Sequence, residues 1–231
     1  MKTESKPGFK HTPPSFGIIE TAGRVYTDTP VGSGNFHKLR EANYGQGFRQ
    51  ATFGEILDLA HQSYLNQGNK GADNVVDATR NFWLSGNTAI RYTPEHVIVQ
   101  DIPEVRDGII VMDEKNLTSK LSKNSRMGVR FSDDGTIRAI PYGFGTEWQN
   151  SEQIRTNSFP IALTGNLEAS EILAQIQDKI GKRGYVWALD KGTNNEIRVP
   201  VLGEDGDGLF LNGDFWGEFF DGSRHSFGVR Q

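Results

Sequence analysis

The sequence predicts an α+β protein with mixed, mostly antiparallel short strands, two main helices and long C-terminal loops. Two segments carry apolar residues at helical spacing, one starting at residue 52 and one over 168–180. The strand-like segments are not separated by regular helices, as a doubly wound parallel sheet would require. Glycine is abundant, with 27 among the 231 residues, which indicates frequent turns.

The first 50 residues show no sustained periodicity. They are polar and rich in Gly and Pro, and we interpret 1–50 as an N-terminal irregular segment or extended arm. The short runs 16–19 and 23–26 leave pairing as strands open. The domain proper is expected to occupy 51–231.

The first helix is predicted to start at Thr52. Glu55 follows three residues later and completes a capping-box pattern, which satisfies the free donors at a helix start. Apolar residues then recur at helical spacing as far as Tyr64, and Gly68 can end the helix. A second, short helix is expected over 74–83.

The segment 168–180 gives the strongest helical pattern. Asn166 can cap this helix, and an apolar stripe runs along it to Ile180. Gly181 supplies the left-handed conformation that ends many helices.

Strand patterns fill most of the remaining chain. Contiguous apolar residues from Ile109 to Val111 indicate a buried strand, and Asp133-Asp134-Gly135 suits a hairpin turn because Gly tolerates positive φ. The predicted strands are 88–93, 96–102, 108–113, 128–131, 136–140, 185–189, 196–202 and 226–230.

Composition narrows the classes of function. The net charge of −4 comes from 25 basic and 29 acidic residues, so no basic face for nucleic acid is expected. The absence of Cys excludes disulfides and thiolate chemistry. There is neither a secretory signal nor an apolar run of about 18 residues, so we expect a soluble chain, cytoplasmic or virion-associated, without membrane insertion.

Motifs for catalysis and metal binding are lacking. The five His have no metal-ligand spacing, and neither a G-x-S-x-G elbow nor a complete phosphate loop occurs. The acidic run 204–208 lacks the remaining ligands of a calcium loop and is interpreted as an acidic turn. We therefore predict a binding protein rather than an enzyme, with no catalytic residue, no metal and no cofactor.

The segment from Arg198 to Gln231 stands apart. Aromatic and acidic residues alternate there with Gly and Asn, without clean strand or helix periodicity. Some of the aromatics must fill the core beneath the loops. The others are interpreted as a recognition surface, in which rigid rings supply contact area and small polar residues supply adaptable hydrogen bonds. The aromatics concerned are Phe210, Phe215, Trp216, Phe219 and Phe220.

This layout resembles the C-terminal variable region of proteins diversified by diversity-generating retroelements, particularly archaeal and viral members. The resemblance covers best residues 198–230, with Ser226 to Arg230 as the final strand and Trp187 and Val199 fitting the scaffold. It implies a C-type lectin fold and a ligand-binding protein whose partner is an unidentified protein or surface ligand. The Glu-Pro-Asn triplet of calcium-dependent lectins is missing, which disfavours calcium-mediated sugar binding.

The resemblance also implies which positions vary. Diversification in that family replaces adenines, chiefly in Asn codons, and such codons never become Trp, Lys, Glu, Gln or Met. Trp216, Glu204 and Glu218 therefore fall outside the variable set, and Trp216 is assigned to the scaffold. The implied ligand-binding, variable positions are Gly203, Asp205, Asp207, Phe210, Asn212, Asp214, Phe215, Phe219, Phe220, Asp221 and His225.

In this interpretation the scaffold is held by main-chain hydrogen bonds and buried apolar side chains. Phe210 and Phe215 would be the main anchors of the ligand. The scaffold residues expected to be buried are Val199, Val201, Leu209, Leu211 and Val229.

Two alternatives remain open. Acidic residues crowd among the aromatics, which would suit a hydrolase using Asp205, Asp207, Asp214 or Glu218. The chain would instead be a structural component of a virion or surface layer if the first 50 residues form an assembly arm.

Overall fold

The computed structural model describes residues 17–21, 23–192, 195–215 and 224–231. Within these residues the chain is a mixed α+β protein, as the sequence predicts, and strands outnumber helices. All strand pairs are antiparallel except β14–β16 and β17–β5. No helix among the described residues has the length and apolar character needed to cross a membrane.

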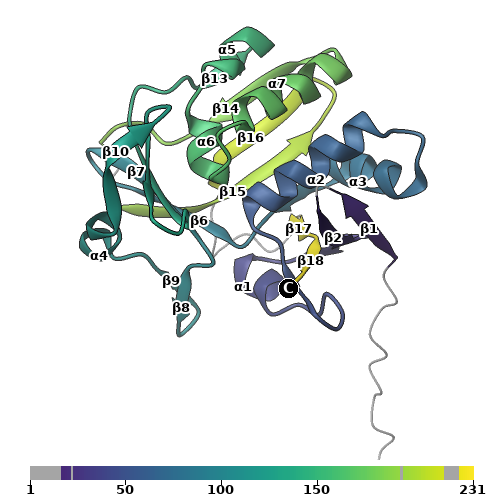
Figure 1. The fold of residues 1–231 in the computed structure, drawn as a ribbon, viewed down its shortest axis with the longest axis horizontal. Helices are drawn as coiled ribbons and strands as arrows, with labels where there is room; N and C mark the ends of the chain where they lie inside the picture. Colours follow the sequence, from purple (N-terminus) through teal and green to yellow (C-terminus); the bar gives the residue numbers. More distant parts are fainter. Residues whose placement is uncertain (1–16, 22, 193–194, 216–223) are drawn as a thin grey trace, which may run out of the picture.

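Three long helices lie together on one side of the main sheet (Figure 1). They are α2 (Phe53–Leu65), α3 (Lys70–Asn81) and α7 (Ala169–Ile180), so the expectation of two main helices is one too few. The shorter helices are α1 (Phe36–Arg40), α4 (Glu114–Ser119), α5 (Ser151–Arg155) and α6 (Phe159–Thr164).

The helix ends follow the local sequence signals closely. The Thr52 and Glu55 capping box is present in full at the start of α2, and Gly181 ends α7 with a φ of 67°. Asn166 does not cap α7 directly. Its Oδ1 atom instead accepts a hydrogen bond from the backbone N–H of Glu168, the residue that precedes the helix. Trp83 lies outside α3, because the helix ends at Asn81.

The main sheet runs in the order β10-β11-β12-β7-β6-β15-β16-β14-β13. Its long strand β15 joins two halves, because its first residues pair with β6 and its later residues pair with β16 and β5. The strands are β10 (Leu121–Arg126), β11 (Val129–Ser132), β12 (Ile137–Pro141), β7 (His96–Asp101), β6 (Thr88–Tyr92), β15 (Glu196–Glu204), β16 (Gly208–Phe215), β14 (Arg183–Trp187) and β13 (Glu147–Gln149), with β5 (Trp83–Ser85), β17 (Arg224–Ser226) and β3 (Val31–Gly32) attached beside β15.

A second sheet unites the two ends of the chain. Its order is β1-β2-β18-β4, so the last strand lies between two strands from the first 50 residues. The prediction of an irregular segment over 1–50 is therefore wrong for its described part, because β18 supplies a distant pairing partner. The strands are β1 (Ile18–Thr21), β2 (Arg24–Thr27), β18 (Gly228–Arg230) and β4 (Phe48–Gln50).

The predicted buried strand over 108–113 is in fact one arm of a small ribbon. The strands β8 (Glu104–Arg106) and β9 (Ile109–Val111) pair only with each other. Ile110 is buried, whereas Ile109 is 58% exposed. A run of apolar residues therefore marks a strand here but does not show that both of its faces are covered.

The segment expected to form long loops is largely a β-hairpin. β15 and β16 pair from Glu204 with Leu209 to Val199 with Phe215, with one irregularity, and residues 205–207 form the tip. The predicted strand 196–202 is confirmed as β15, whose residues from Arg198 to Glu204 are all buried, whereas β16 lies where loops were expected.

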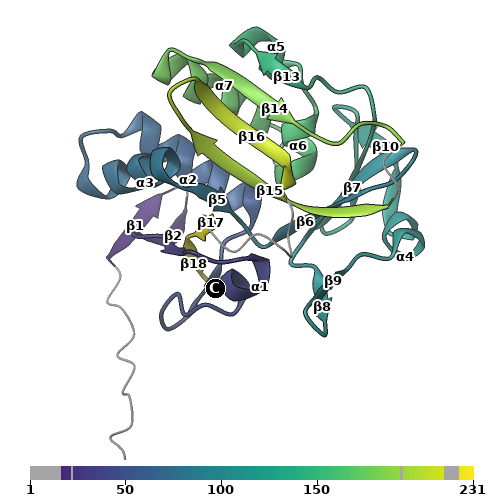
Figure 2. The same cartoon turned by 180° about the vertical axis from the view of Figure 1, so that it is seen from behind.

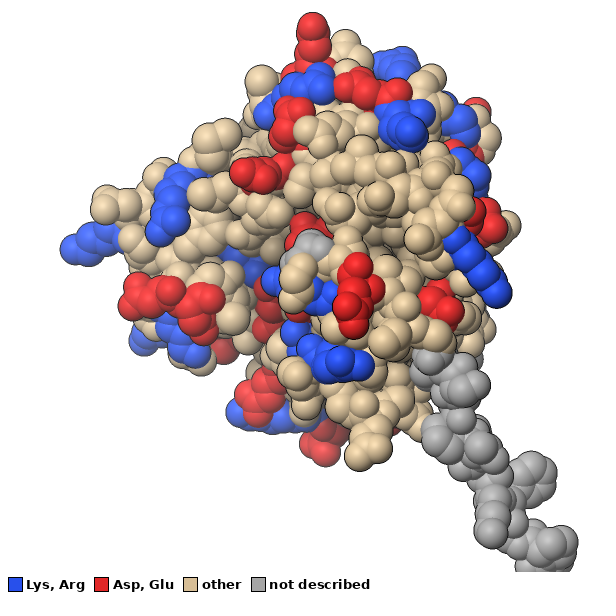
Figure 3. Space-filling model, turned by 45° about the vertical axis from the view of Figure 1, so that its right-hand side comes forward, with Lys and Arg blue, Asp and Glu red and all other residues tan. Residues whose placement is uncertain are grey.

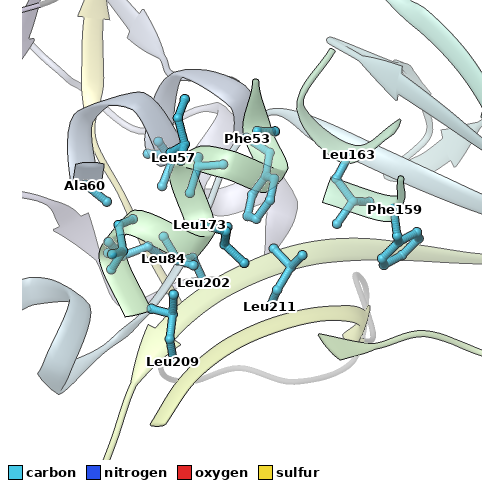
Figure 4. Close-up of a cluster of buried hydrophobic side chains, with 14 of the residues drawn as sticks. Phe53, Leu57, Ala60, Leu84, Phe159, Leu163, Leu173, Leu202, Leu209 and Leu211 are labelled. Carbon is cyan, nitrogen blue, oxygen red and sulfur yellow. The ribbon is translucent and has the colours of Figure 1, made fainter. Parts of the chain in front are cut away.

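The core lies between this hairpin and the helices. Figure 4 shows Leu202, Leu209 and Leu211 of the sheet facing Leu57 of α2 and Leu173 of α7. The predicted scaffold residues are confirmed as buried, each at most 1% exposed: Val199, Val201, Leu209, Leu211 and Val229.

On the other side of the hairpin, no helix of the described residues is present. Seen from behind in Figure 2, β14, β16 and β15 lie in front of α7 and α6. Side chains alternate between the two faces along a strand, so Phe210 and Asn212 occupy the outer face, opposite to the inward Leu209 and Leu211. Gly213 confirms this alternation, because its neighbours are Phe159 and Tyr92 of the core.

Replacing Leu211 by Ala is expected to lower the free energy of unfolding by about 2–5 kcal/mol, because it opens a cavity between hairpin and helices. The same substitution at Leu167, which is 40% exposed, should cost much less. Urea unfolding followed by circular dichroism measures both. Equal losses for the two variants would show that β16 does not face the core as described.

Candidate functional site

Aromatic side chains from four separate strands meet on the outer face of the main sheet. Trp148 of β13 is aligned with Tyr185 of β14, Tyr185 with Phe210 of β16, and Phe210 with Gly203 of β15. Trp83 of β5 lies next to Gly203. We call the four aromatic residues, Trp148, Tyr185, Phe210 and Trp83, the aromatic row.

Phe210 is the centre of the row. Its ring centroid lies 6.0 Å from that of Trp83, 5.5 Å from Trp148 and 5.8 Å from Tyr185. Trp148 and Tyr185 also contact each other edge to face at 5.0 Å. Such distances are typical of favourable aromatic pairs, so the rings hold one another in place.

Gly203 makes the row possible. A Cβ atom at this position would lie 2.9 Å from the ring of Trp83, closer than side chains approach each other. Gly203 is also buried. Its assignment as a variable ligand-contact position is therefore corrected, because most side chains there would displace Trp83.

Trp187 extends the face by one more ring. It is 48% exposed, lies 5.7 Å from Tyr185, and is aligned with Asn212 on β16. Trp187 was assigned to the scaffold from the sequence, yet half of its surface is open to solvent. The guanidinium of Arg183 lies over the ring of Trp148 at 6.0 Å and adds a cation to this edge.

Asp214, next to the irregularity between β15 and β16, is bound to the scaffold. Its Oδ1 atom accepts a hydrogen bond of 2.8 Å from Nε of Arg198, and Glu196 accepts another from the same guanidinium. The side chain of Arg198 is only 4% exposed. A change at Asp214 therefore leaves a buried cation short of one of its counter-ions, which restricts how freely this position can vary.

The remaining predicted site residues are divided between the hairpin tip and other places. Asp205 and Asp207 are exposed at the tip, where Oδ1 of Asp205 accepts hydrogen bonds from the backbone N–H groups of Asp207 and Gly208. The acidic run thus forms a turn, as predicted. Among the described residues, no three His, Asp or Glu side chains gather closely enough to hold a metal ion.

His225 does not share the face of Phe210. It is aligned with Leu84, whose side chain lies in the core on the helix side, and its ring stacks on Phe82 at 3.8 Å. Its assignment to a common ligand-binding surface is corrected accordingly. The side chain of Phe215 and the whole of Trp216, Glu218, Phe219, Phe220 and Asp221 lie outside the described residues.

A polar cleft borders the hairpin tip on the helix side. Glu204 is 5% exposed and accepts hydrogen bonds from Tyr64 Oη at 2.5 Å, from Arg80 Nε at 3.1 Å and from Lys182 Nζ at 3.2 Å. The cleft has a volume of about 510 Å³, and Lys179 also lines it.

The charge state of Glu204 follows from these contacts. Burial acts to raise its pKa, but the hydrogen bonds from Tyr64, Lys182 and Arg80 outweigh burial and lower the pKa below its ordinary value. The carboxylate is thus ionised at neutral pH. Burial and the same carboxylate raise the pKa of Tyr64, which stays a neutral donor.

Sequence reasoning identified one half of this site and missed the other. Phe210, Asn212 and the hairpin tip were expected to form a ligand surface. Trp83 was placed in a helix, and Trp148 and Tyr185 were not singled out. The alternation Tyr185-x-Trp187 was a usable signal, because both rings then project from the same face of a strand.

Comparisons with protein-family models, with curated proteins and with solved structures found no match to this chain. The candidate site is therefore judged from its own geometry. On the side of the molecule drawn in Figure 3, Lys and Arg are interspersed with Asp and Glu, without a large area of one sign.

Replacing Asp214 by Ala is expected to destabilise the fold by about 2 kcal/mol or more, because Arg198 keeps its charge in a buried place with one counter-ion fewer. The double variant D214A/R198M should recover part of the loss. Asp207→Ala removes an acidic side chain from the exposed tip and should change stability by only about 0.5 kcal/mol. Equal effects of D214A and D207A in thermal unfolding would contradict the structural role of Asp214.

The lowered pKa of Glu204 gives a pH prediction. A carboxyl with a lowered pKa contributes stability above its unfolded-state pKa of roughly 4.3, and that contribution disappears as pH falls through the folded-state value. Glu204→Gln should therefore be less stable than the parent protein at pH 7, and the difference in melting temperature should shrink towards pH 3. A constant difference between pH 7 and pH 3 would show that Glu204 does not titrate in this way.

Proposed function

We propose that the chain is a ligand-binding protein and that its partner is another protein. The recognition surface is the outer face of β16, β14 and β13, bordered by Trp83 of β5. The observation that carries this proposal is the aromatic row together with the half-exposed Trp187, on a face that no helix of the described part of the chain covers.

The chemistry of this face suits a protein partner. Trp and Tyr are enriched among the residues that dominate protein interfaces, since they bury a large area with few rotatable bonds. The rings already contact one another, so little side-chain entropy remains to be lost on binding. Arg183 beside Trp148 and Asn212 beside Trp187 supply polar contacts around the apolar centre.

We further propose that the protein is the variable protein of a diversity-generating retroelement with a C-type lectin-like scaffold. The two faces of β16 support this idea. Main-chain bonds to β15 and β14 and the inward leucines hold the strand, so outward side chains can change without loss of pairing. The positions that suit variation best are Asp205, Asp207, Phe210 and Asn212.

A display library tests the surface. Randomising 205, 207, 210 and 212 should preserve folded display and yield binders to a purified target such as lysozyme, because these side chains point away from the core. A matched library at the inward positions 84, 202, 209 and 211 should lose display. Comparable loss in both libraries would contradict the proposed separation of scaffold and surface.

A selected binder then tests the aromatic face itself. Trp187→Ala should weaken its binding to lysozyme at least tenfold, because the exposed ring is removed from the contact. Met127→Ala removes a 62% exposed apolar side chain at another place and should leave the affinity unchanged. Unchanged affinity of the W187A variant would remove Trp187 from the recognition surface.

The diversification itself has a genomic test. We expect, beside the coding region, a near-identical repeat with Asn codons at the variable positions and a gene for a reverse transcriptase. Absence of both would refute the diversification part of the proposal and would leave ligand binding to be judged by the library.

A further inference from the structure

The polar cleft beside Glu204 contains cationic groups whose hydrogen-bond donors are only partly bound by the carboxylate of Glu204. Three cations line it, on Arg80, Lys179 and Lys182, against the two carboxylates of Glu204 and Asp205. Glu204 binds the Nε edge of Arg80, and among the described residues the two terminal amino groups of that guanidinium have no hydrogen-bond partner. The Arg80 side chain is 45% exposed, so this end of the guanidinium is open to a ligand.

Lys182 is held in the same manner. Its Nζ atom donates to Glu204 at 3.2 Å and to the backbone oxygen of Asp205 at 2.8 Å. The third of its three N–H groups can therefore donate to a ligand. Glu204 thereby orients two cations towards the cleft at fixed positions. Asp205 offers little competition, because its carboxylate is engaged with the backbone of the turn.

An apolar groove adjoins this cleft. It has a volume of about 200 Å³, is lined by Phe82, Trp83 and Gly203, and shares Arg80, Glu204 and Asp205 with the polar cleft. A planar ring placed in this groove would therefore bring a group attached to it close to Arg80.

We propose that the two cavities form one binding site for a small anion carried on a planar ring, with the anionic group on Arg80 and Lys182. The anion is a phosphate or a carboxylate, and the paired N–H groups of Arg80 suit both. Glu204 is a positioning residue that holds the two cations. This site adjoins the aromatic face proposed above for a protein partner at Trp83, but it does not rest on that proposal.

The opposing explanation is a structural one. α3 and α7 both end beside the cleft, and the partial negative charge at a helix C-terminus is stabilised by a cation in the last turn. Arg80 and Lys179 occupy such positions. If that were their whole role, the cleft would bind no anion.

Titration with phenyl phosphate, benzoate and inorganic phosphate at pH 7.5 and low ionic strength separates these explanations. We expect saturable binding of phenyl phosphate by isothermal calorimetry, weakened about tenfold for inorganic phosphate, which lacks the ring. Comparison with benzoate shows whether phosphate or carboxylate is preferred. No saturable binding of any of the three would overturn the proposal and leave Arg80 and Lys179 as helix-end cations.

Variants locate the site. Arg80→Gln and Lys182→Gln should each weaken phenyl phosphate binding at least tenfold, whereas Lys123→Gln removes the same charge from the exposed strand β10 and should have no effect. Phe82→Leu should reduce the advantage of phenyl phosphate over inorganic phosphate. Melting temperatures identify variants that fail to fold, and equal binding by R80Q and K123Q would overturn the proposal whatever the result for the aromatic face.

Discussion

The structure depends on the position of β16 between β15 and β14. Main-chain hydrogen bonds run to both neighbours, and Leu209 and Leu211 press the strand against the helices. Because side chains alternate along a strand, this register places Phe210 and Asn212 on the outer face. A slip of one residue would exchange the two sets and put Asn212 into the core. The buried leucines therefore fix the composition of the outer face as well as the stability of the hairpin.

The same arrangement limits which positions of the segment can change their side chain without destabilising the fold. Gly203 is needed because the ring of Trp83 occupies the space of its side chain, and Asp214 is needed because Arg198 is buried beside it. A list of variable positions drawn from residue types alone includes both. In the structure, some residues of these strands only face solvent. Others on the same strands make contacts that hold the sheet together. The surface open to change is consequently smaller than the segment 198–230, and it centres on Phe210, Asn212 and the hairpin tip.

What could be predicted from the sequence was local. The capping box of Thr52 and Glu55 and the stop at Gly181 depend on residues a few positions apart, and both are present. The strands β1 and β2 were left open, because β2 pairs with β18, in which Val229 is aligned with Tyr26 from the other end of the chain. The aromatic row was not predictable as a unit, since its rings come from four strands that only the folded sheet aligns. Of the hairpin, β15 was predicted as the strand 196–202, whereas β16 was expected to be loop because Gly and Asn interrupt its apolar residues.

The aromatic row and the polar cleft meet at Trp83 and Gly203. Trp83 packs against Phe210 within the row and also forms a wall of the apolar groove beside Arg80. Glu204 follows Gly203 directly and has its side chain on the helix face of β15. The same strand therefore contacts the ring of Trp83 on one face and orients Arg80 and Lys182 on the other. A ligand in the groove would therefore touch the edge of the protein-binding face without occupying it. Because the inward packing of β15 keeps both features in place, the distance between them is fixed by the sheet rather than by a loop.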